Sequence, residues 1–318
     1  MRILVLGAGG TGGYFGGRLV QSGADVVFLA RPPRAGQLRE QGLRLRSPLG
    51  DAHLEVTAVT TQTLPAEVAK QRFDLVLLSC KAYDLDSAIE AIAPAVGEET
   101  AVLPVLNGLR HYPVLDERFG QDRILGGLCF ISASKGPNGE IVHMGKAASI
   151  TFGERHGDPD SMRTAAFASV CEHANIDHLR SMRIVQQQWE KYTFLTTLAA
   201  ATCLMRASVG QIVDDNDGLD FMRSLYRECL SVAEASGEPI TADAQAGALE
   251  ILTRKCSPMT ASMLRDIEAG QPIEAEQIVG DMHYRARAAG LPVPLLTIAE
   301  CHLRAYQRVR ADRQRKPS

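Results

Sequence analysis

Met1-Arg2-Ile3-Leu4-Val5-Leu6-Gly7-Ala8-Gly9-Gly10-Thr11-Gly12 opens the chain, and its pattern is typical of one kind of nucleotide-binding fold. Its short apolar run predicts a buried strand, which is followed by a glycine-rich turn with the spacing GxGxxG and a helical pattern over residues 12–22. In such a turn the first glycine permits the bend, the second lets a pyrophosphate approach the backbone, and the third lets helix and strand pack closely. The N–H groups at the helix start favour an anion. The sequence therefore predicts a dinucleotide site formed by Gly7, Ala8, Gly9, Gly10, Thr11 and Gly12.

The first half of the chain alternates short apolar runs with longer helical patterns. The runs that we interpret as strands are residues 3–6, 26–29, 75–78, 102–106 and 124–128, and the helical patterns cover residues 12–22, 36–41 and 85–95. This alternation is typical of βαβ units, so we expect an α/β Rossmann domain with a mostly parallel, doubly wound sheet. Gly13, Gly16 and Gly17 are expected to pack the first helix against strands. Residues 43–59 and 129–152 are interpreted as hairpins, and the second is expected to close one edge of the sheet.

The second half of the chain has a different pattern of predicted secondary structure. After residue 181 the strand patterns stop, and long helical patterns cover residues 185–207, 219–236, 241–253, 260–269 and 272–289. A chain of 318 residues is also long for one core. We therefore expect two domains, a nucleotide-binding domain over residues 1–180 and an all-α domain over residues 181–318. The basic segment 304–316 is expected to be a solvated helix end.

Composition excludes several classes of protein. A net charge of −3 offers no basic face for a phosphate backbone, so a nucleic acid partner is not expected. The seven cysteines include no CxxC pair, which predicts reduced thiols, and His111, His143 and His283 have no partner at metal-ligand spacing. The apolar run at the start is too short for a signal peptide, and no run could span a bilayer. We expect a cytoplasmic protein without a metal or membrane contact.

The end of the second predicted strand indicates which dinucleotide binds. A site that prefers NAD places an acidic residue there to bind the ribose 2′-hydroxyl. This strand instead ends in Phe28-Leu29-Ala30-Arg31, with Arg34 nearby. A guanidinium can bind a 2′-phosphate through two hydrogen bonds but offers a hydroxyl no acceptor. The sequence therefore predicts NADP.

Two further polar residues follow predicted strands. Lys81 comes after residues 75–78, and Asn107 comes after residues 102–106. In open α/β sheets ligands bind beyond the carboxyl ends of the strands. Both residues are therefore candidates for contacts with ribose, nicotinamide or a substrate, although an ordinary loop role is equally compatible with their position.

Several motifs, taken in order, resemble the ketopantoate reductase (2-dehydropantoate 2-reductase) family. In the first half they are the glycine-rich turn, Cys80-Lys81-Ala82 and Leu106-Asn107-Gly108. In the second half they are Trp189-Glu190-Lys191, Ser262-Met263-Leu264-Arg265-Asp266, Pro272-Ile273-Glu274 and Ala288-Ala289-Gly290-Leu291-Pro292-Val293-Pro294. The resemblance covers essentially the whole chain, and it implies a fold similar to that of 6-phosphogluconate dehydrogenase, with the active site between the two domains.

The resemblance also implies an activity, the NADPH-dependent reduction of 2-dehydropantoate to (R)-pantoate in pantothenate biosynthesis. It assigns the catalytic lysine to Lys191 and its supporting carboxylate to Glu274. These types suit the reaction, because hydride transfer to a ketone leaves charge on oxygen, which an ammonium can stabilise and then protonate. The resemblance further implies that Ser262 binds the substrate, with Lys81 and Asn107 near the nicotinamide and the reacting carbonyl.

The sequence departs from the family pattern at three substrate positions. Asparagines that the family places one and two helical turns after the lysine are Leu195 and Ala199 here, and the asparagine before the serine is Met259. Apolar side chains leave polar groups of pantoate unpaired, at about 1–3 kcal/mol each. An alternative is therefore the reduction of a more apolar 2-oxo acid, and an alternative of another class is an NADP-binding sensor without catalysis. The long apolar helices could also bury against a second copy, so a homodimer is a further hypothesis.

Overall fold

The computed structural model describes residues 1–315, and the chain forms two compact units. Residues Met1–Leu106 and His111–Val185 make up the first, which we call the N-terminal unit. Asn107–Arg110 and the residues from Gln186 onward make up the second, the helical unit. The predicted division after residue 180 lies five residues before the observed one, and no pattern in the sequence predicts that the short segment 107–110 belongs with the helices.

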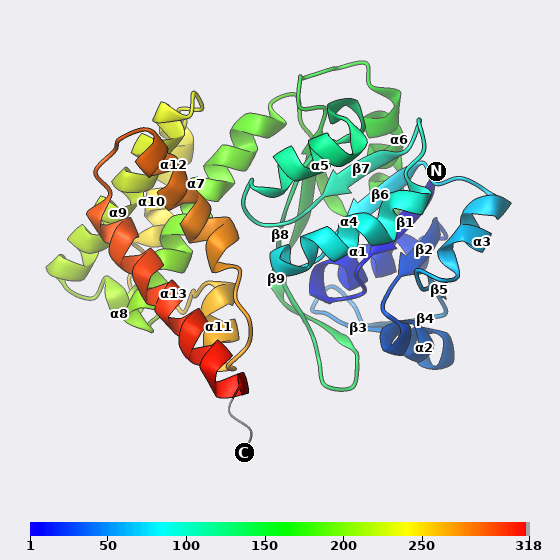
Figure 1. The fold of residues 1–318 in the computed structure, drawn as a ribbon, viewed down its shortest axis with the longest axis horizontal. Helices are drawn as coiled ribbons and strands as arrows, with labels where there is room; N and C mark the ends of the chain where they lie inside the picture. Colours follow the sequence, from blue (N-terminus) through cyan, green and yellow to red (C-terminus); the bar gives the residue numbers. More distant parts are fainter. Residues whose placement is uncertain (316–318) are drawn as a thin grey trace. The chain divides into compact units, whose positions relative to one another are not determined.

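The N-terminal unit contains a parallel sheet with the strand order β5-β2-β1-β6-β7 (Figure 1). Its strands are β1 Arg2–Leu6, β2 Asp25–Leu29, β5 Thr57–Val59, β6 Leu75–Leu78 and β7 Ala101–Pro104. Its helices are α1 Gly10–Gln21, α2 Pro32–Gln41, α3 Leu64–Lys70, α4 Leu85–Ile92 and α5 His111–Phe119, and a short 3-10 turn, Ala82–Asp84, precedes α4. All four strand pairs are parallel, and β1, β6 and β7 are fully buried. The predicted Rossmann-type fold is confirmed.

A second sheet in the same unit has the order β10-β9-β3-β4, and β8 also pairs with β9. Its strands are β3 Leu43–Arg46, β4 Ala52–Leu54, β8 Gly126–Lys135, β9 Ile141–Gly153 and β10 Asp177–Arg180, and α6 Met162–His173 precedes β10. Both predicted hairpins exist, although residues 57–59 leave the first one to pair with β2. The prediction that the second hairpin closes an edge of the parallel sheet was wrong. Its long strand β9 pairs in parallel with β3, and one isolated bridge, from Ile124 to Val102, reaches β7.

Helix α1 lies against both sheets, because its glycines let strands approach closely. A Cβ atom at Gly16 would lie 2.7 Å from the ring of Phe28 in β2. A Cβ at Gly13 would lie 2.8 Å from Ile141 in β9, and one at Gly17 would lie 3.0 Å from Leu45 in β3. The predicted packing role of these glycines is confirmed, and it fixes the start of α1 at the carboxyl end of β1.

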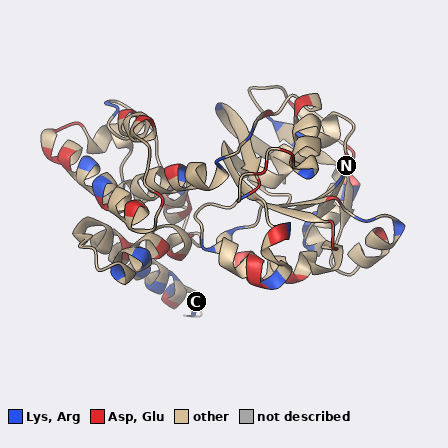
Figure 2. Cartoon of the chain, turned by 90° about the horizontal axis from the view of Figure 1, so that it is seen from above, with Lys and Arg blue, Asp and Glu red and all other residues tan. Residues whose placement is uncertain are grey.

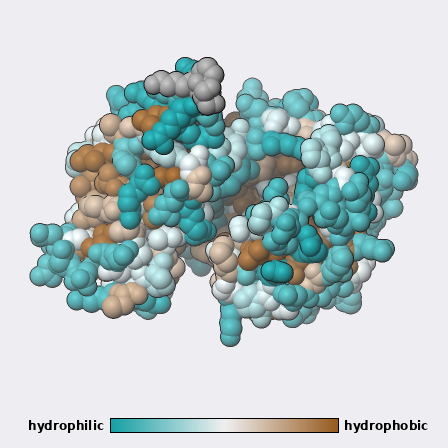
Figure 3. Space-filling view, turned by 90° about the horizontal axis from the view of Figure 1, so that it is seen from below, coloured by the Kyte–Doolittle hydropathy of each residue, from teal (hydrophilic) through white to brown (hydrophobic). Residues whose placement is uncertain are grey.

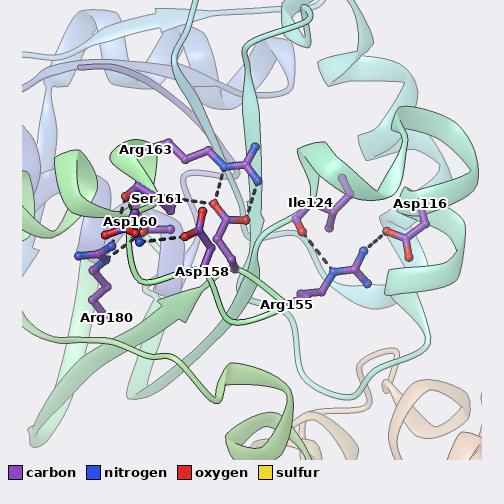
Figure 4. A network of polar contacts seen from close by, with 10 residues as sticks. Asp116, Ile124, Arg155, Asp158, Asp160, Ser161, Arg163 and Arg180 are labelled. Carbon is purple, nitrogen blue, oxygen red and sulfur yellow. Dashed lines mark hydrogen bonds and ion pairs between the residues drawn. The ribbon is translucent and has the colours of Figure 1, made fainter.

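A polar network holds the segment that follows β9 (Figure 4). The buried carboxylate of Glu154 accepts hydrogen bonds from Ser161 Oγ at 2.6 Å and from Arg163 Nε at 2.7 Å. Burial raises the pKa of Glu154, but the hydrogen bonds and charge of Arg163 together with the bond from Ser161 hold it below its ordinary value. Arg180 adds a hydrogen bond from its Nε to Thr164 Oγ1 at 2.9 Å. The network ties α6 to β10 and to the segment that follows β9.

The helical unit confirms the predicted all-α character. Its helices are α7 Ile184–Met205, α8 Val209–Ile212, α9 Asn216–Ala235, α10 Ala242–Leu252, α11 Ser262–Glu268, α12 Asp281–Ala288 and α13 Pro294–Arg315, with a π-helix at Glu276–Gly280. The π-helix was not predicted. The predicted basic helix end is part of the longer α13, and Lys316 lies outside the described residues. Acidic and basic residues are both found along the helices of each unit (Figure 2).

Within residues 1–315 no helix is both long and apolar enough to cross a membrane, and no disulfide joins the cysteines. The same residues contain no group of three or more side chains arranged to hold a metal ion.

Candidate functional site

The glycine-rich turn has the geometry that its spacing predicts. Gly7 has φ +97, and a Cβ there would lie 2.9 Å from the carbonyl oxygen of Ser79. A Cβ at Gly12 would lie 2.1 Å from Gly7 O, so the third glycine permits close packing of helix on strand. Around a Cβ at Gly9, in contrast, no described atom lies within 4 Å. Gly9 caps α1, so its backbone is open to an anion at the helix start.

Gly10 differs from its neighbours, because a Cβ at this position would lie 2.3 Å from Ala133 O in β8. The sequence predicts that all six residues from Gly7 to Gly12 bind the cofactor. The structure gives Gly10 a packing contact with the second sheet, so the open part of the turn is centred on Gly9.

Arg31 is the residue that the sequence predicts to bind a 2′-phosphate. It caps the start of α2, and its side chain is 73% exposed. Its guanidinium forms an ion pair with Asp84 at 2.7 Å, which occupies one of its nitrogens. Arg31 therefore lies just after the second strand, as predicted, and it is paired with Asp84.

Arg34 lies closer to the glycine-rich turn. Its Nε donates to Ala8 O at 3.2 Å, and one of its terminal nitrogens donates to Gln37 Oε1 at 2.7 Å. Its other terminal nitrogen is buried and has no hydrogen-bond partner among the described residues. Burial lowers the pKa of Arg34, and the charge of Arg44 lowers it further. A half-buried cation with an unused donor, beside another cation, is suited to bind an anionic group such as a phosphate.

Lys81 and Asn107 lie in different units although both follow strands of the parallel sheet. Lys81 follows β6 in the N-terminal unit, where it caps the 3-10 turn before α4. Asn107 belongs to the helical unit, where its Oδ1 accepts a hydrogen bond from Lys191 Nζ at 3.1 Å. The structure thus joins two predicted site residues, Asn107 and Lys191.

The other predicted residues of the helical unit lie on three elements. Leu195 and Ala199 follow Lys191 by one and two turns of α7, so the three share one face of that helix. Ser262 begins α11, and the preceding backbone N–H, of Ala261, donates to Thr202 Oγ1 of α7 at 3.3 Å.

Met259 and Glu274 lie in the connections on either side of α11. Met259 has a side chain that is 38% exposed, and its carbonyl oxygen accepts from Val209 N at 2.9 Å. Glu274 is 8% exposed and lies just before the π-helix. Apolar residues therefore stand at the three positions where the resemblance predicts asparagine. Leu195 and Met259 are partly accessible, and Ala199 is buried.

A buried network beside Lys191 was not predicted. Tyr192 Oη lies 2.9 Å from Ile278 O of the π-helix and 3.0 Å from Asp281 Oδ2. Arg285 Nε donates to the same carboxylate oxygen at 2.9 Å, and its guanidinium lies over the ring of Trp189. Burial raises the pKa of Tyr192 well above its ordinary value, and the charge of Asp281 adds to this. In the sequence, the motif around Lys191 is the only feature that points to this network, because the partners of Tyr192 lie almost 90 residues further along the chain.

Both halves of the chain match one protein family. Residues 3–157 match the family described as ketopantoate reductase PanE/ApbA, and residues 183–307 match its C-terminal part. An uncharacterised oxidoreductase of Bacillus subtilis, YkpB, is 33% identical over 96% of this chain and 99% of its own length.

Two solved structures are also similar. The 2-dehydropantoate 2-reductase from Geobacter metallireducens is 28% identical, with a TM-score of 0.85 over 96% of this chain and 99% of its own. D-mandelate dehydrogenase with NADH and anilino(oxo)acetate shares the fold at 19% identity, with a TM-score of 0.85 over 98% of this chain and 99% of its own. The chain therefore belongs to the ketopantoate reductase family and is an NAD(P)-dependent oxidoreductase that acts on CH–OH groups.

Proposed function

We propose that this enzyme reduces a 2-oxo acid to the corresponding 2-hydroxy acid with NADPH, and that 2-dehydropantoate, reduced to (R)-pantoate, is the leading candidate substrate. The observation that carries the proposal is the hydrogen bond from Lys191 Nζ to Asn107 Oδ1. It orients a partly buried ammonium through a neutral acceptor, so this bond does not neutralise the charge of the ammonium.

The residues of the helical unit account for the proton part of the reaction. When bound, the reduced nicotinamide supplies a hydride to the carbonyl carbon of the 2-oxo acid. Lys191 would donate a hydrogen bond to the carbonyl oxygen, stabilise the charge that develops there and transfer its proton to complete the hydroxyl. The resulting amine regains a proton from solvent. Glu274 would support the charge of Lys191, and Ser262 would bind the substrate carboxylate or hydroxyl.

The preference for NADPH over NADH rests on Arg34 together with Arg31. Arg34 offers a buried, unused N–H beside the glycine-rich turn, and Arg44 adds positive charge. These groups suit a dianionic 2′-phosphate better than a neutral ribose hydroxyl. We propose that Lys81 and the turn from Gly7 to Gly12 contribute the remaining cofactor contacts.

A more apolar 2-oxo acid is the second candidate substrate. Leu195 and Ala199 lie on the face of α7 that carries Lys191, and Met259 is partly exposed. Side chains of this kind favour a branched or aromatic group over the hydroxyl of pantoate by about 1–3 kcal/mol for each polar group left unpaired.

Initial rates of NADPH oxidation distinguish the two substrates. The purified protein would be given 2-dehydropantoate and a panel of alkyl and aryl 2-oxo acids at equal concentrations. The highest kcat/KM for 2-dehydropantoate would support the leading proposal, and the highest value for a bulky apolar acid would support the second. No oxidation with any 2-oxo acid would contradict both.

We also propose that the protein forms a homodimer through the helical unit. Apolar residues reach the surface of this unit (Figure 3, brown), and its exposed large apolar side chains are Met205, Met259, Tyr284, Ile298 and Val309. Light scattering of the purified protein tests this directly, since a monomer mass would contradict it.

A further inference from the structure

The segment Asn107–Arg110 is held by the helical unit at its glycine. Gly108 has φ +81, and a Cβ at this position would lie 2.3 Å from Gln277 O and 3.3 Å from the carbonyl carbon of the same residue. A backbone carbonyl cannot give way as a side-chain end can, so only glycine fits. The ion pair from Arg110 to Glu276, at 3.9 Å and exposed, adds little to this contact. Gly108 therefore fixes Asn107 against the π-helix.

Tyr192 fixes the other partner against the same π-helix. Its hydroxyl oxygen lies 2.9 Å from Ile278 O, and the residue is 1% exposed. Asp281 and Arg285 complete the arrangement around this hydroxyl. Tyr192 directly follows Lys191 in α7, so its anchor limits how α7 can turn or slide at the lysine.

Two contacts thus converge on consecutive carbonyl groups of one short element. The neighbour of Asn107 contacts Gln277 O, and the neighbour of Lys191 contacts Ile278 O. Both carbonyls belong to Glu276–Gly280, a π-helix, which is an element frequently found at functional sites. The geometry points to Gly108 and Tyr192 as positioning residues, which use the π-helix as a common support to keep the amide oxygen of Asn107 on the ammonium of Lys191.

This inference rests on the proposed role of Lys191, and it can be tested apart from turnover. Gly108→Ala adds a Cβ that must displace Asn107, and Tyr192→Phe removes one hydroxyl in a side chain of nearly equal size. Gly237→Ala is the matched control for the first, because Gly237 has φ +83 in the same unit with no described atom within 4 Å of its Cβ. Tyr306→Phe is the control for the second, because Tyr306 Oη also donates to a backbone carbonyl, Gln271 O, at 2.8 Å.

The first readout is the labelling rate of the Lys191 amine by an amine-reactive reagent, measured by mass spectrometry without substrate. We expect faster labelling in Gly108→Ala and Tyr192→Phe and the wild-type rate in both controls. The second readout is turnover with NADPH. We expect kcat to fall by about 10²-fold in Gly108→Ala and about ten-fold in Tyr192→Phe, with the KM for NADPH little changed.

A double-mutant cycle with Asn107→Ala completes the test. If Gly108 acts through Asn107, Gly108→Ala has little further effect on labelling in the Asn107→Ala background. The inference would be overturned if both variants were labelled at the same rate as their controls. It would also be overturned if Gly108→Ala had its full effect in the Asn107→Ala background. A wild-type protein without turnover would refute the proposed function alone, since the labelling comparison would still decide the positioning role.

Discussion

Lys191 Nζ and Asn107 Oδ1 lie 3.1 Å apart within one unit, although 84 residues separate them in the chain. Asn107 is reached from the end of a strand in the N-terminal unit, yet it belongs with the helices. This pairing gives the ammonium a neutral acceptor that holds one of its N–H groups in a fixed direction.

Replacement of Asn107 by alanine is expected to reduce kcat. The variant loses a hydrogen bond to a charged group, of about 1.5–3 kcal/mol, and the lysine loses its orientation. We predict a reduction of about ten-fold or more in kcat with NADPH and the best 2-oxo acid. Asn107→Asp, which keeps the acceptor and adds charge, should extend the activity to higher pH because a carboxylate stabilises the ammonium. An Asn107→Ala enzyme with wild-type kcat would disprove the role of this bond.

Arg34→Ala is expected to weaken the binding of NADPH and to leave that of NADH nearly unchanged. A charge-assisted bond to a 2′-phosphate contributes about 1.5–3 kcal/mol, which corresponds to a loss of about 10- to 100-fold in affinity. Calorimetric titration of both nucleotides measures the ratio. Arg39→Ala, on the exposed part of the same helix, is the matched control. Equal losses for NADPH and NADH would assign Arg34 to another part of the cofactor.

Leu195→Asn is expected to change the choice of substrate. An amide one turn after Lys191 can pair with a hydroxyl group of the substrate, and it is costly to bury beside an alkyl or aryl chain. We predict that the ratio of kcat/KM for 2-dehydropantoate to that for an apolar 2-oxo acid rises by about ten-fold or more. An unchanged ratio would show that Leu195 does not contact the substrate.

Glu154→Gln is expected to destabilise the N-terminal unit. Breaking a buried, hydrogen-bonded ion pair costs about 3–5 kcal/mol, which would appear as a lower Tm in calorimetry. Glu250→Gln, in an exposed ion pair with Arg254, should lie within about 0.5 kcal/mol of the wild type. A Tm loss no greater than that of this control would show that the network in Figure 4 adds little to stability.

The same carboxylate sets a pH dependence of stability. The pKa of Glu154 is lowered in the folded protein, so its contribution is fully present above the unfolded pKa and is lost as pH falls through the folded value. The difference in Tm between the wild type and Glu154→Gln should therefore decrease below about pH 4, near the ordinary pKa of glutamate. A difference in Tm that stayed constant through acid pH would contradict this assignment.

Features set by neighbouring residues could be predicted from the sequence. The turn at Gly7 and the packing at Gly12 and Gly16 depend on local spacing, and the helices of the second half follow from a period of apolar residues. The ion pair of Arg31 and the unpartnered nitrogen of Arg34 could not be predicted, because they depend on the direction of side chains and on Asp84, more than 50 residues from Arg31.

Contacts between distant parts of the chain could not be predicted either, because they too depend on residues far apart in the sequence. The parallel pairing of β3 with β9 joins residues that are about a hundred positions apart. The membership of Asn107 in the helical unit, and the support that the π-helix gives to Gly108 and Tyr192, also depend on the folded chain. The family motifs name Lys191, Asn107 and Glu274, but they do not state which of them touch.

The proposed role of Lys191 is tested by the rate of NADPH oxidation with the preferred 2-oxo acid in Lys191→Ala, compared with Lys255→Ala as an exposed-lysine control. If Lys191 is the proton donor, Lys191→Ala lowers kcat by about 10²- to 10⁴-fold, the range for a positioned acid, while Lys255→Ala keeps the wild-type rate. A Lys191→Ala enzyme that turned over at the wild-type rate would contradict the assignment of Lys191 as the proton donor.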